Sequence, residues 1–352
     1  GRRRHRRGSG QGDGRHAPRM SAAELPVANS YAALSPDNPL RRRMRAPWRR
    51  RPVEIEAEFD AQTLFYDCFR HDDGETILLV GPPPRGLEAA YAAARFVARP
   101  SGATLRAKTY ASLSVAVTAL AGAPAHTETV DVEIAGEQFS LAVQPSATRA
   151  LAGRRVLFSV NKDNELGWIR EWALYHARRH GTDAVILFDN GSSRYGRAEI
   201  VETLRSVPGL SHVGVPVWPY PFGPIDPCVR KDPYWARFLQ IGTMSVLLRR
   251  YGERAAGLLD CDIDELAGTH SGRSIYELAR ESKGGLVVFR GTWIEATGGS
   301  RHRDFTQRLS NAEAARSPQR KWALDPTRQW VRKLSVQPYW HWIEGRARFV
   351  KS

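Results

Sequence analysis

The amino-acid sequence predicts an α/β protein whose second half forms a mainly parallel sheet flanked by helices. From Arg155 onward, short apolar runs alternate with stretches of helical periodicity, the pattern of repeated strand–helix–strand units. Between residues 53 and 150 the apolar runs are shorter and are broken by turn residues, which predicts a smaller β-rich domain. A chain of 352 residues is long enough for both.

The β-rich domain is predicted over residues 53–150. Val130–Ile134 alternates apolar and polar side chains with a period of two, and Gly136 separates this run from the next. Leu87–Phe96 predicts a short helix. The other strands predicted for this domain are Thr63–Cys68, Thr76–Val80, Thr104–Lys108 and Phe139–Val143.

The second domain is predicted over residues 151–352. In Leu166–His180 the apolar side chains recur at helical spacing, so Trp172 is predicted as core and His176 as a packing histidine. Short connections between its elements imply right-handed crossovers. The predicted strands are Val156–Val160, Ala184–Phe188, His212–Trp218 and Ala255–Leu259, and the other predicted helices are Tyr195–Ser206 and Tyr234–Tyr251.

The most informative segment is an acid cluster, Asp260–Glu265, which holds four carboxylates in six residues and follows a predicted strand directly. In an extended segment Asp260, Asp262 and Asp264 would share one face, about 6.6 Å apart at successive positions. Such carboxylates suit a hard divalent cation, Mg²⁺ or Mn²⁺, bound together with substrate phosphates. A solvated acidic turn that caps the next element is the alternative that the segment alone leaves open.

The net charge of +15 is concentrated at the start of the chain. Residues 1–52 contain 14 arginines and three acidic residues, a net of +11, so the remaining 300 residues carry +4. This composition predicts a basic, disordered tail over residues 1–52 and argues against nucleic acid as the partner of the second domain. The cluster Arg41–Arg51, which includes Met44 and Trp48, favours peripheral contact with an anionic membrane. A start of translation at Met20, which would leave residues 1–19 untranslated, is an open alternative.

The cysteines and the apolar runs bear on the compartment. Cys68, Cys228 and Cys261 are far apart and odd in number, which favours a reducing compartment over a disulfide framework. We find no apolar run of the roughly 18–20 residues that span a bilayer. The expected location is cytoplasmic, peripheral to the inner face of the membrane.

The second domain contains five motif segments in a fixed order. They are Asn161–Glu165, Glu171-Trp172, Tyr175-His176, Phe188–Ser192 and Asp262–Leu266. This series resembles that of the family 92 glycosyltransferases and their bacterial, family 2-related relatives. The resemblance covers roughly residues 155–345 and includes the late elements Lys321-Trp322, Pro326 and His341-Trp342. Asp163 is an extra residue in the first motif, and Leu266 stands where an aromatic residue is common.

The resemblance implies the GT-A nucleotide-diphospho-sugar transferase fold and a metal site. Asp262 and Asp264 correspond to the family's D-x-D pair, which holds Mn²⁺ or Mg²⁺ against the donor diphosphate, and His341 is a further candidate ligand. Asp260 and Glu265 are lesser candidates, because Glu265 also suits a capping role.

The resemblance also implies donor-binding residues. Lys162 and Glu165 follow the first strand, and Asp189 and Asn190 close the second, where they would contact the nucleotide. The alternatives are that Glu165 interacts with the positive end of the helix it begins, and that Asp189-Asn190 form an ordinary turn.

A general base is expected beyond the last long helix. Glu295, beside Trp293, is the first candidate, and Asp304 is the second. Arg301, His302 and Arg303 would assist the diphosphate or form a basic surface loop.

The expected function is therefore metal-dependent transfer of a hexose, with inversion, from a nucleotide sugar to a glycan or lipid-linked acceptor. A UDP-sugar, UDP-galactose among them, is the favoured donor. A metal-dependent phosphohydrolase or nuclease, and a catalytically inactive sugar-binding module, are the alternatives. Removal of residues 1–52 is expected to spare turnover on soluble acceptors and to abolish liposome binding.

Overall fold

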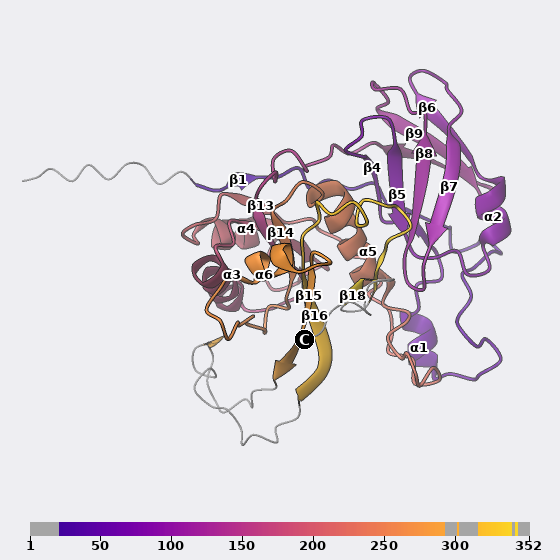
Figure 1. Ribbon diagram of the computed structural model, residues 1–352. Coiled ribbons are helices and arrows are strands. Elements are labelled where there is room, and N and C mark those ends of the chain that lie inside the picture. Colours follow the sequence, from indigo (N-terminus) through magenta and orange to yellow (C-terminus); the bar gives the residue numbers. More distant parts are fainter. Residues whose placement is uncertain (1–20, 293–300, 303–315, 340–341, 344–352) are drawn as a thin grey trace, which may run out of the picture.

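The computed structural model describes residues 21–292, 301–302, 316–339 and 342–343. The chain folds as a mixed α/β structure with a large, mostly parallel sheet in its centre and a β-rich module at one end (Figure 1). The predicted α/β class with a parallel sheet and flanking helices is confirmed at this level.

The main sheet has seven strands in the order β1-β13-β12-β11-β14-β16-β15. The first five strands in this order are parallel, β16 is antiparallel to β14, and β15 is antiparallel to β16. The bounds are β1 Ala23–Glu24, β11 Arg155–Asn161, β12 Ala184–Asp189, β13 His212–Gly214, β14 Gly257–Asp260, β15 Leu286–Thr292 and β16 Arg316–Leu324.

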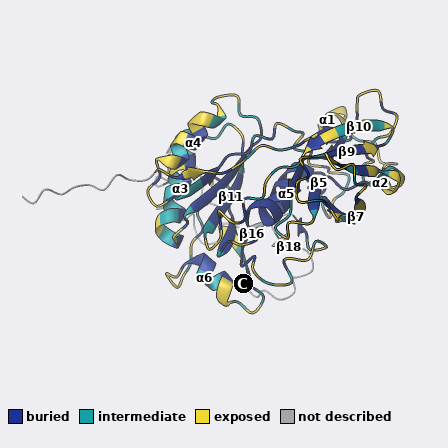
Figure 2. Cartoon of the chain, turned by 90° about the horizontal axis from the view of Figure 1, so that it is seen from above, coloured by how far each residue is buried: buried dark blue, intermediate teal, exposed yellow. Residues whose placement is uncertain are grey.

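Helices cover both faces of the main sheet, which explains why its central strands are apolar on both sides. Along β11, Val156 and Phe158 pack with α5 (Phe238–Val246) and the π-helical turn η1 (Leu247–Tyr251). Leu157, between them, faces the opposite core with α3 (Leu166–His180), α4 (Arg197–Arg205) and α6 (Ile275–Glu281). The exposed residues of α3 and α4 lie on the outer faces of these two helices (Figure 2).

The β module, residues 32–142, contains a four-stranded sheet, a three-stranded sheet and the β2-β3 pair. The predicted helix Leu87–Phe96 is shorter than expected, because the backbone is already extended at Ala94 and β6 begins at Arg95. The bounds are β2 Ala32–Ala33, α1 Val53–Glu58, β3 Thr63–Phe65, β4 Asp67–Arg70, β5 Ile77–Gly81, α2 Glu88–Ala93, β6 Arg95–Arg99, β7 Arg106–Ala111, β8 Ala116–Ala121, β9 Thr129–Ile134 and β10 Glu137–Ala142. A last pair, β17 Pro338–Tyr339 and β18 Trp342–Ile343, pairs antiparallel.

The prediction of a disordered tail over residues 1–52 is wrong for residues 21–52. Ala23–Glu24 form an edge strand of the main sheet, and Arg42 is only 2% exposed, donating to the carbonyls of Pro83 and Asp60. The prediction from composition assumed that every arginine is solvated. The N–H groups of a buried guanidinium can instead donate hydrogen bonds to carbonyl oxygens. A truncation that removes residues 1–52 therefore removes part of the sheet, and cannot separate membrane binding from turnover.

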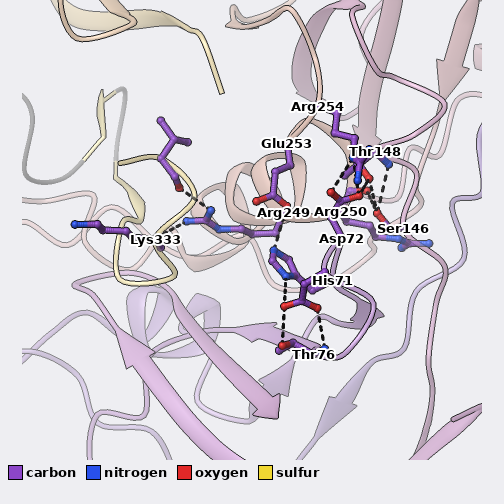
Figure 3. Close-up of polar contacts among 12 residues, drawn as sticks. His71, Asp72, Thr76, Ser146, Thr148, Arg249, Arg250, Glu253, Arg254 and Lys333 are labelled. Atoms are coloured by element: carbon purple, nitrogen blue, oxygen red, sulfur yellow. Dashed lines mark hydrogen bonds and ion pairs between the residues drawn. The ribbon is translucent and has the colours of Figure 1, made fainter. Parts of the chain in front are cut away.

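Ion pairs join the β module to η1 and to the turn that follows it, and Figure 3 shows the contact of His71 with that turn. The Arg250 guanidinium lies 2.8 Å from the Asp67 carboxylate, and both side chains are buried. Next to it, the two ring nitrogens of His71 lie 3.0 Å from Asp73 and 3.1 Å from the buried Glu253 carboxylate. Burial alone would lower the pKa of His71, but these carboxylates raise it, so the imidazolium form holds the contact.

Among the described residues, we find no helix that is both long and apolar enough to cross a bilayer.

Neutralising Asp67 is expected to destabilise the whole chain, because it leaves Arg250 buried without its charge partner. The Asp67→Asn variant should lose about 3–5 kcal/mol of unfolding free energy in urea titrations. The matched control is Glu281→Gln, which breaks the exposed Arg273–Glu281 pair and should cost at most about 1 kcal/mol. Equal losses in the two variants would contradict the structural role of the buried pair.

Candidate functional site

Polar residues end three neighbouring strands at the carboxyl edge of the main sheet. Asn161 ends β11, Asp189 ends β12 and pairs with Asn161 in register, and Asp260 ends β14 on the other side of β11. In open parallel sheets ligands bind at this edge. The structure therefore brings the acid cluster and the Asp189-Asn190 segment to the same edge, on either side of one strand.

The acid cluster is a turn, and the expectation that its three aspartates share an extended face is wrong. The Glu265 amide donates to the Asp262 carbonyl at 3.0 Å, and the Asp262 amide donates to the Glu265 carboxylate at 2.9 Å. Cys261 and Ile263 are buried in the core, and this fixes the turn from inside. We call Asp260–Glu265 the acid turn.

A buried lysine from β16 lies inside the acid turn. The Lys321 ammonium is 2.6 Å from the Asp262 carboxylate and 3.2 Å from that of Glu265, and the residue is 3% exposed. Burial alone would lower the pKa of Lys321, but the charges of Asp262, Asp260 and Glu265 outweigh it and raise the pKa. Lys321 is therefore a charged ammonium that partly neutralises the acid turn.

The surroundings of Glu265 bring its pKa close to neutral pH. Burial, followed by the charge of Asp262, raises the pKa of Glu265 to about 7, although Lys321 opposes the shift. The Glu265 side chain closes the turn on Asp262, whereas Asp264 is exposed. This contact agrees with the capping role considered for Glu265 and not with a role as a metal ligand.

The carboxylates suit a divalent ion only together with other ligands. The described part of the chain contains no group of three or more histidine, cysteine, aspartate or glutamate side chains that is arranged to hold a metal. Asp264 is exposed, and Asp262 shares its carboxylate with Lys321. Mg²⁺ is commonly bound by one or two carboxylates plus substrate phosphates, and binding of such an ion by Asp262 and Asp264 stays a prediction.

The side chains of Asp189 and Asn190 are engaged within the protein. The Asn161 amide donates to Asp189 at 2.7 Å, and the Asn190 amide donates to the carbonyls of Trp218 and Tyr220 at 2.7 and 2.9 Å. Both residues are buried. These contacts correspond to the turn-forming alternative, and nucleotide contact through these two side chains stays a prediction.

Lys162 and Glu165 are exposed at the start of α3. Glu165 is the residue that precedes the first helical turn, and its carboxylate lies 2.6 Å from Arg194. The extra residue Asp163 accepts the backbone amides of Ser193 and Arg194 at 2.7 and 3.0 Å. Asp163 thus ties the loop after β12 to the loop after β11, at the edge where the donor is expected.

Two histidines of α3 hold Ala267, two residues after the acid turn. The Ala267 amide donates to Nε2 of His176 at 3.2 Å, and Nε2 of His180 lies 2.8 Å from the Ala267 carbonyl. Nδ1 of His176 donates to the Trp172 carbonyl at 2.8 Å, so both rings are neutral and each has one fixed tautomer. Trp172 and His176 are fully buried, as predicted.

His302, which was expected to assist the diphosphate or to lie in a basic surface loop, lies against the acid turn. Its Nε2 is 2.6 Å from the Ile263 carbonyl, and its backbone amide donates to Glu171 at 3.0 Å. The ring also packs on Trp168 with centroids 5.2 Å apart. No local spacing could have found this contact, since His302 reaches the turn from a distant part of the chain.

Other predicted site residues lie outside the described residues. They are the two candidate bases Glu295 and Asp304, the candidate ligand His341, and Arg303. The described part of the site therefore consists of the acid turn, Lys321 and the loops after β11 and β12.

We compared the chain with protein-family models, with curated proteins and with solved structures, and nothing matched. The resemblance to family 92 glycosyltransferases stays a prediction from the motifs. The function is accordingly argued from the geometry of the strand edge.

Acidification is expected to destabilise the protein through His176. Burial lowers the pKa of His176 to about 3, whereas an unfolded histidine titrates near 6.5. Between these values the unfolded chain takes up a proton that the folded chain excludes. Stability is therefore fully present above about pH 6.5 and is lost as the pH falls. This single group should lower the unfolding free energy by about 2 kcal/mol between pH 7 and pH 5.

Urea titrations at pH 7 and pH 5 measure this loss. The His176→Gln variant keeps an acceptor for Ala267 but does not titrate, so its loss should be smaller by about 2 kcal/mol. An identical pH dependence in wild type and variant would show that His176 is not excluded from protonation.

Proposed function

We propose that the protein is a glycosyltransferase that moves a hexose from a nucleoside diphosphate sugar, a UDP-sugar by preference, to a glycan or lipid-linked acceptor, with inversion. The observation that carries the proposal is the acid turn at the carboxyl edge of a parallel sheet, with the Lys321 ammonium inside it. The motif order of residues 155–345 supports the same reading.

The chemistry of the donor fits this edge. Release of a nucleoside diphosphate leaves a dianionic group, which positively charged partners must stabilise as the glycosidic bond breaks. Asp262 and Asp264 would hold Mn²⁺ or Mg²⁺, which when bound supplies Lewis-acid stabilisation of the diphosphate. Lys321 pairs with Asp262 and holds its carboxylate at the edge of the sheet.

The remaining residues divide into binding and positioning roles. Lys162 and Glu165 are exposed beside the strand edge, where they would reach the nucleotide. Asp189 and Asn190 position the loop that follows β12 through their internal hydrogen bonds. The proton of the acceptor hydroxyl would pass to a carboxylate, for which Glu295 and Asp304 are the candidates.

Binding of the donor and the ion is expected to depend on Asp264. In a thermal-shift screen of UDP-, GDP-, CMP- and dTDP-sugars with and without Mn²⁺, one nucleotide class should stabilise the wild type. At 100-fold excess over Kd, the stabilisation is about 2.7 kcal/mol. Because Asp264 is exposed, Asp264→Asn should keep the melting temperature of the free protein and lose the Mn²⁺-dependent shift.

The matched control is Glu56→Gln, which removes an exposed carboxylate from α1 and should respond like the wild type. The absence of any shift in the folded wild type would contradict the proposal. Release of free sugar at the same rate with and without acceptors would instead favour the hydrolase.

A further inference from the structure

Two loops that are distant in the sequence lie together beside α1 at one end of the molecule (Figure 1). They are residues 45–53 and residues 225–232, and we call them the paired loops. The Arg51 guanidinium lies 2.8 Å from the Asp226 carboxylate, and both side chains are almost fully buried.

Further contacts join the paired loops. The Arg45 guanidinium lies 2.5 Å from the Asp232 carboxylate, and Arg49 donates to the Cys228 carbonyl. The Asp226 carboxylate also accepts the indole N–H of the buried Trp235 at 2.9 Å. The loops are therefore fixed to each other and to the core.

The paired loops present apolar side chains to solvent. Trp48 is 80% exposed, Val53 is 75% exposed and Ile225 is 47% exposed. These are the three most exposed large hydrophobic side chains of the described residues. A fixed cluster of this kind marks an interaction site, whereas single exposed apolar residues need no explanation.

The charges that surround these side chains are basic. The two ion pairs neutralise Arg45 and Arg51, and the four other charged residues of the paired loops are all cations. These four are exposed, and they are Arg49, Arg50, Arg230 and Lys231. The paired loops therefore present a tryptophan and two aliphatic side chains, together with a net charge of +4 from these four cations.

The acidic side chains of α1 mark one border of this surface. Glu54, Glu56 and Glu58 are exposed and follow Val53 directly. Because they would be repelled by an anionic partner, contact is expected through the tips of the paired loops and not through α1.

We propose that the paired loops dock the protein on an anionic lipid bilayer. Trp48 and Ile225 enter the headgroup region, where tryptophan is favoured because its ring is amphipathic. The four cations pair with lipid phosphates, and each basic residue near such a surface strengthens binding about fivefold. This inference does not depend on the proposed transferase activity.

The aliphatic side chains favour a bilayer over a nucleic acid as the partner. An indole stacks on a base, but Ile225 and Val53 have no such partner on single-stranded RNA. An interfacial lipid layer covers Trp48 and Ile225 and pairs with the cations at once.

The test is vesicle co-sedimentation of the full chain with phosphatidylcholine vesicles that contain 0 or 30% phosphatidylglycerol, in 0.1 M salt. We expect binding to the anionic vesicles only. Trp48→Ala should weaken it about tenfold, because the indole no longer leaves water. Arg50→Gln/Lys231→Gln should weaken it about thirtyfold. Brominated lipid should quench a fluorescence component that Trp48→Phe lacks.

The control Arg178→Gln/Lys283→Gln removes two exposed cations from other parts of the surface and should bind like the wild type. All variants keep the N-terminal arginines, so binding through that segment is the same in each. Equal vesicle binding by wild type, Trp48→Ala and the loop charge variant would overturn the proposal. So would a Trp48-dependent affinity for single-stranded RNA without a Trp48-dependent affinity for vesicles.

Discussion

The buried ammonium of Lys321 is the constraint on which the candidate site depends. β16 runs antiparallel beside β14, so a side chain from the end of the chain reaches the carboxylates that follow β14. A buried charge is tolerated only when it is paired, and Asp262 and Glu265 supply the pairing. The same contact holds the acid turn at the carboxyl edge of the sheet and limits the repulsion among its carboxylates.

Contacts from other elements fasten the acid turn further. His176 and His180 hold both polar groups of Ala267, and His302 lies against the Ile263 carbonyl. Charge stabilisation is most effective when the polar groups need no rearrangement as charge develops. A turn fixed through Lys321, α3 and His302 meets that condition, and Asp264 is exposed, as its proposed role in holding an ion requires.

The sequence predicted the central elements well because their signals are local. Helical spacing located α3 within its observed bounds, Leu166–His180, and apolar runs located β11, β12 and β14. The contact of Lys321 was not predictable, since no spacing rule joins residues that meet only in the folded sheet. The alternation expected for Asp260, Asp262 and Asp264 failed because Glu265 closes a turn there. The prediction that residues 21–52 are disordered failed because the partners of their buried arginines are distant in the chain and cannot be seen in the composition.

The most direct test of this account is the urea unfolding free energy of Lys321→Met. Methionine replaces the aliphatic part of the lysine side chain but leaves Asp262 and Glu265 without the ammonium between them. The account predicts a loss of about 3–5 kcal/mol relative to the wild type, with little change in Lys283→Met, whose side chain is exposed. A Lys321→Met protein as stable as the wild type would contradict the claim that this ammonium organises the acid turn.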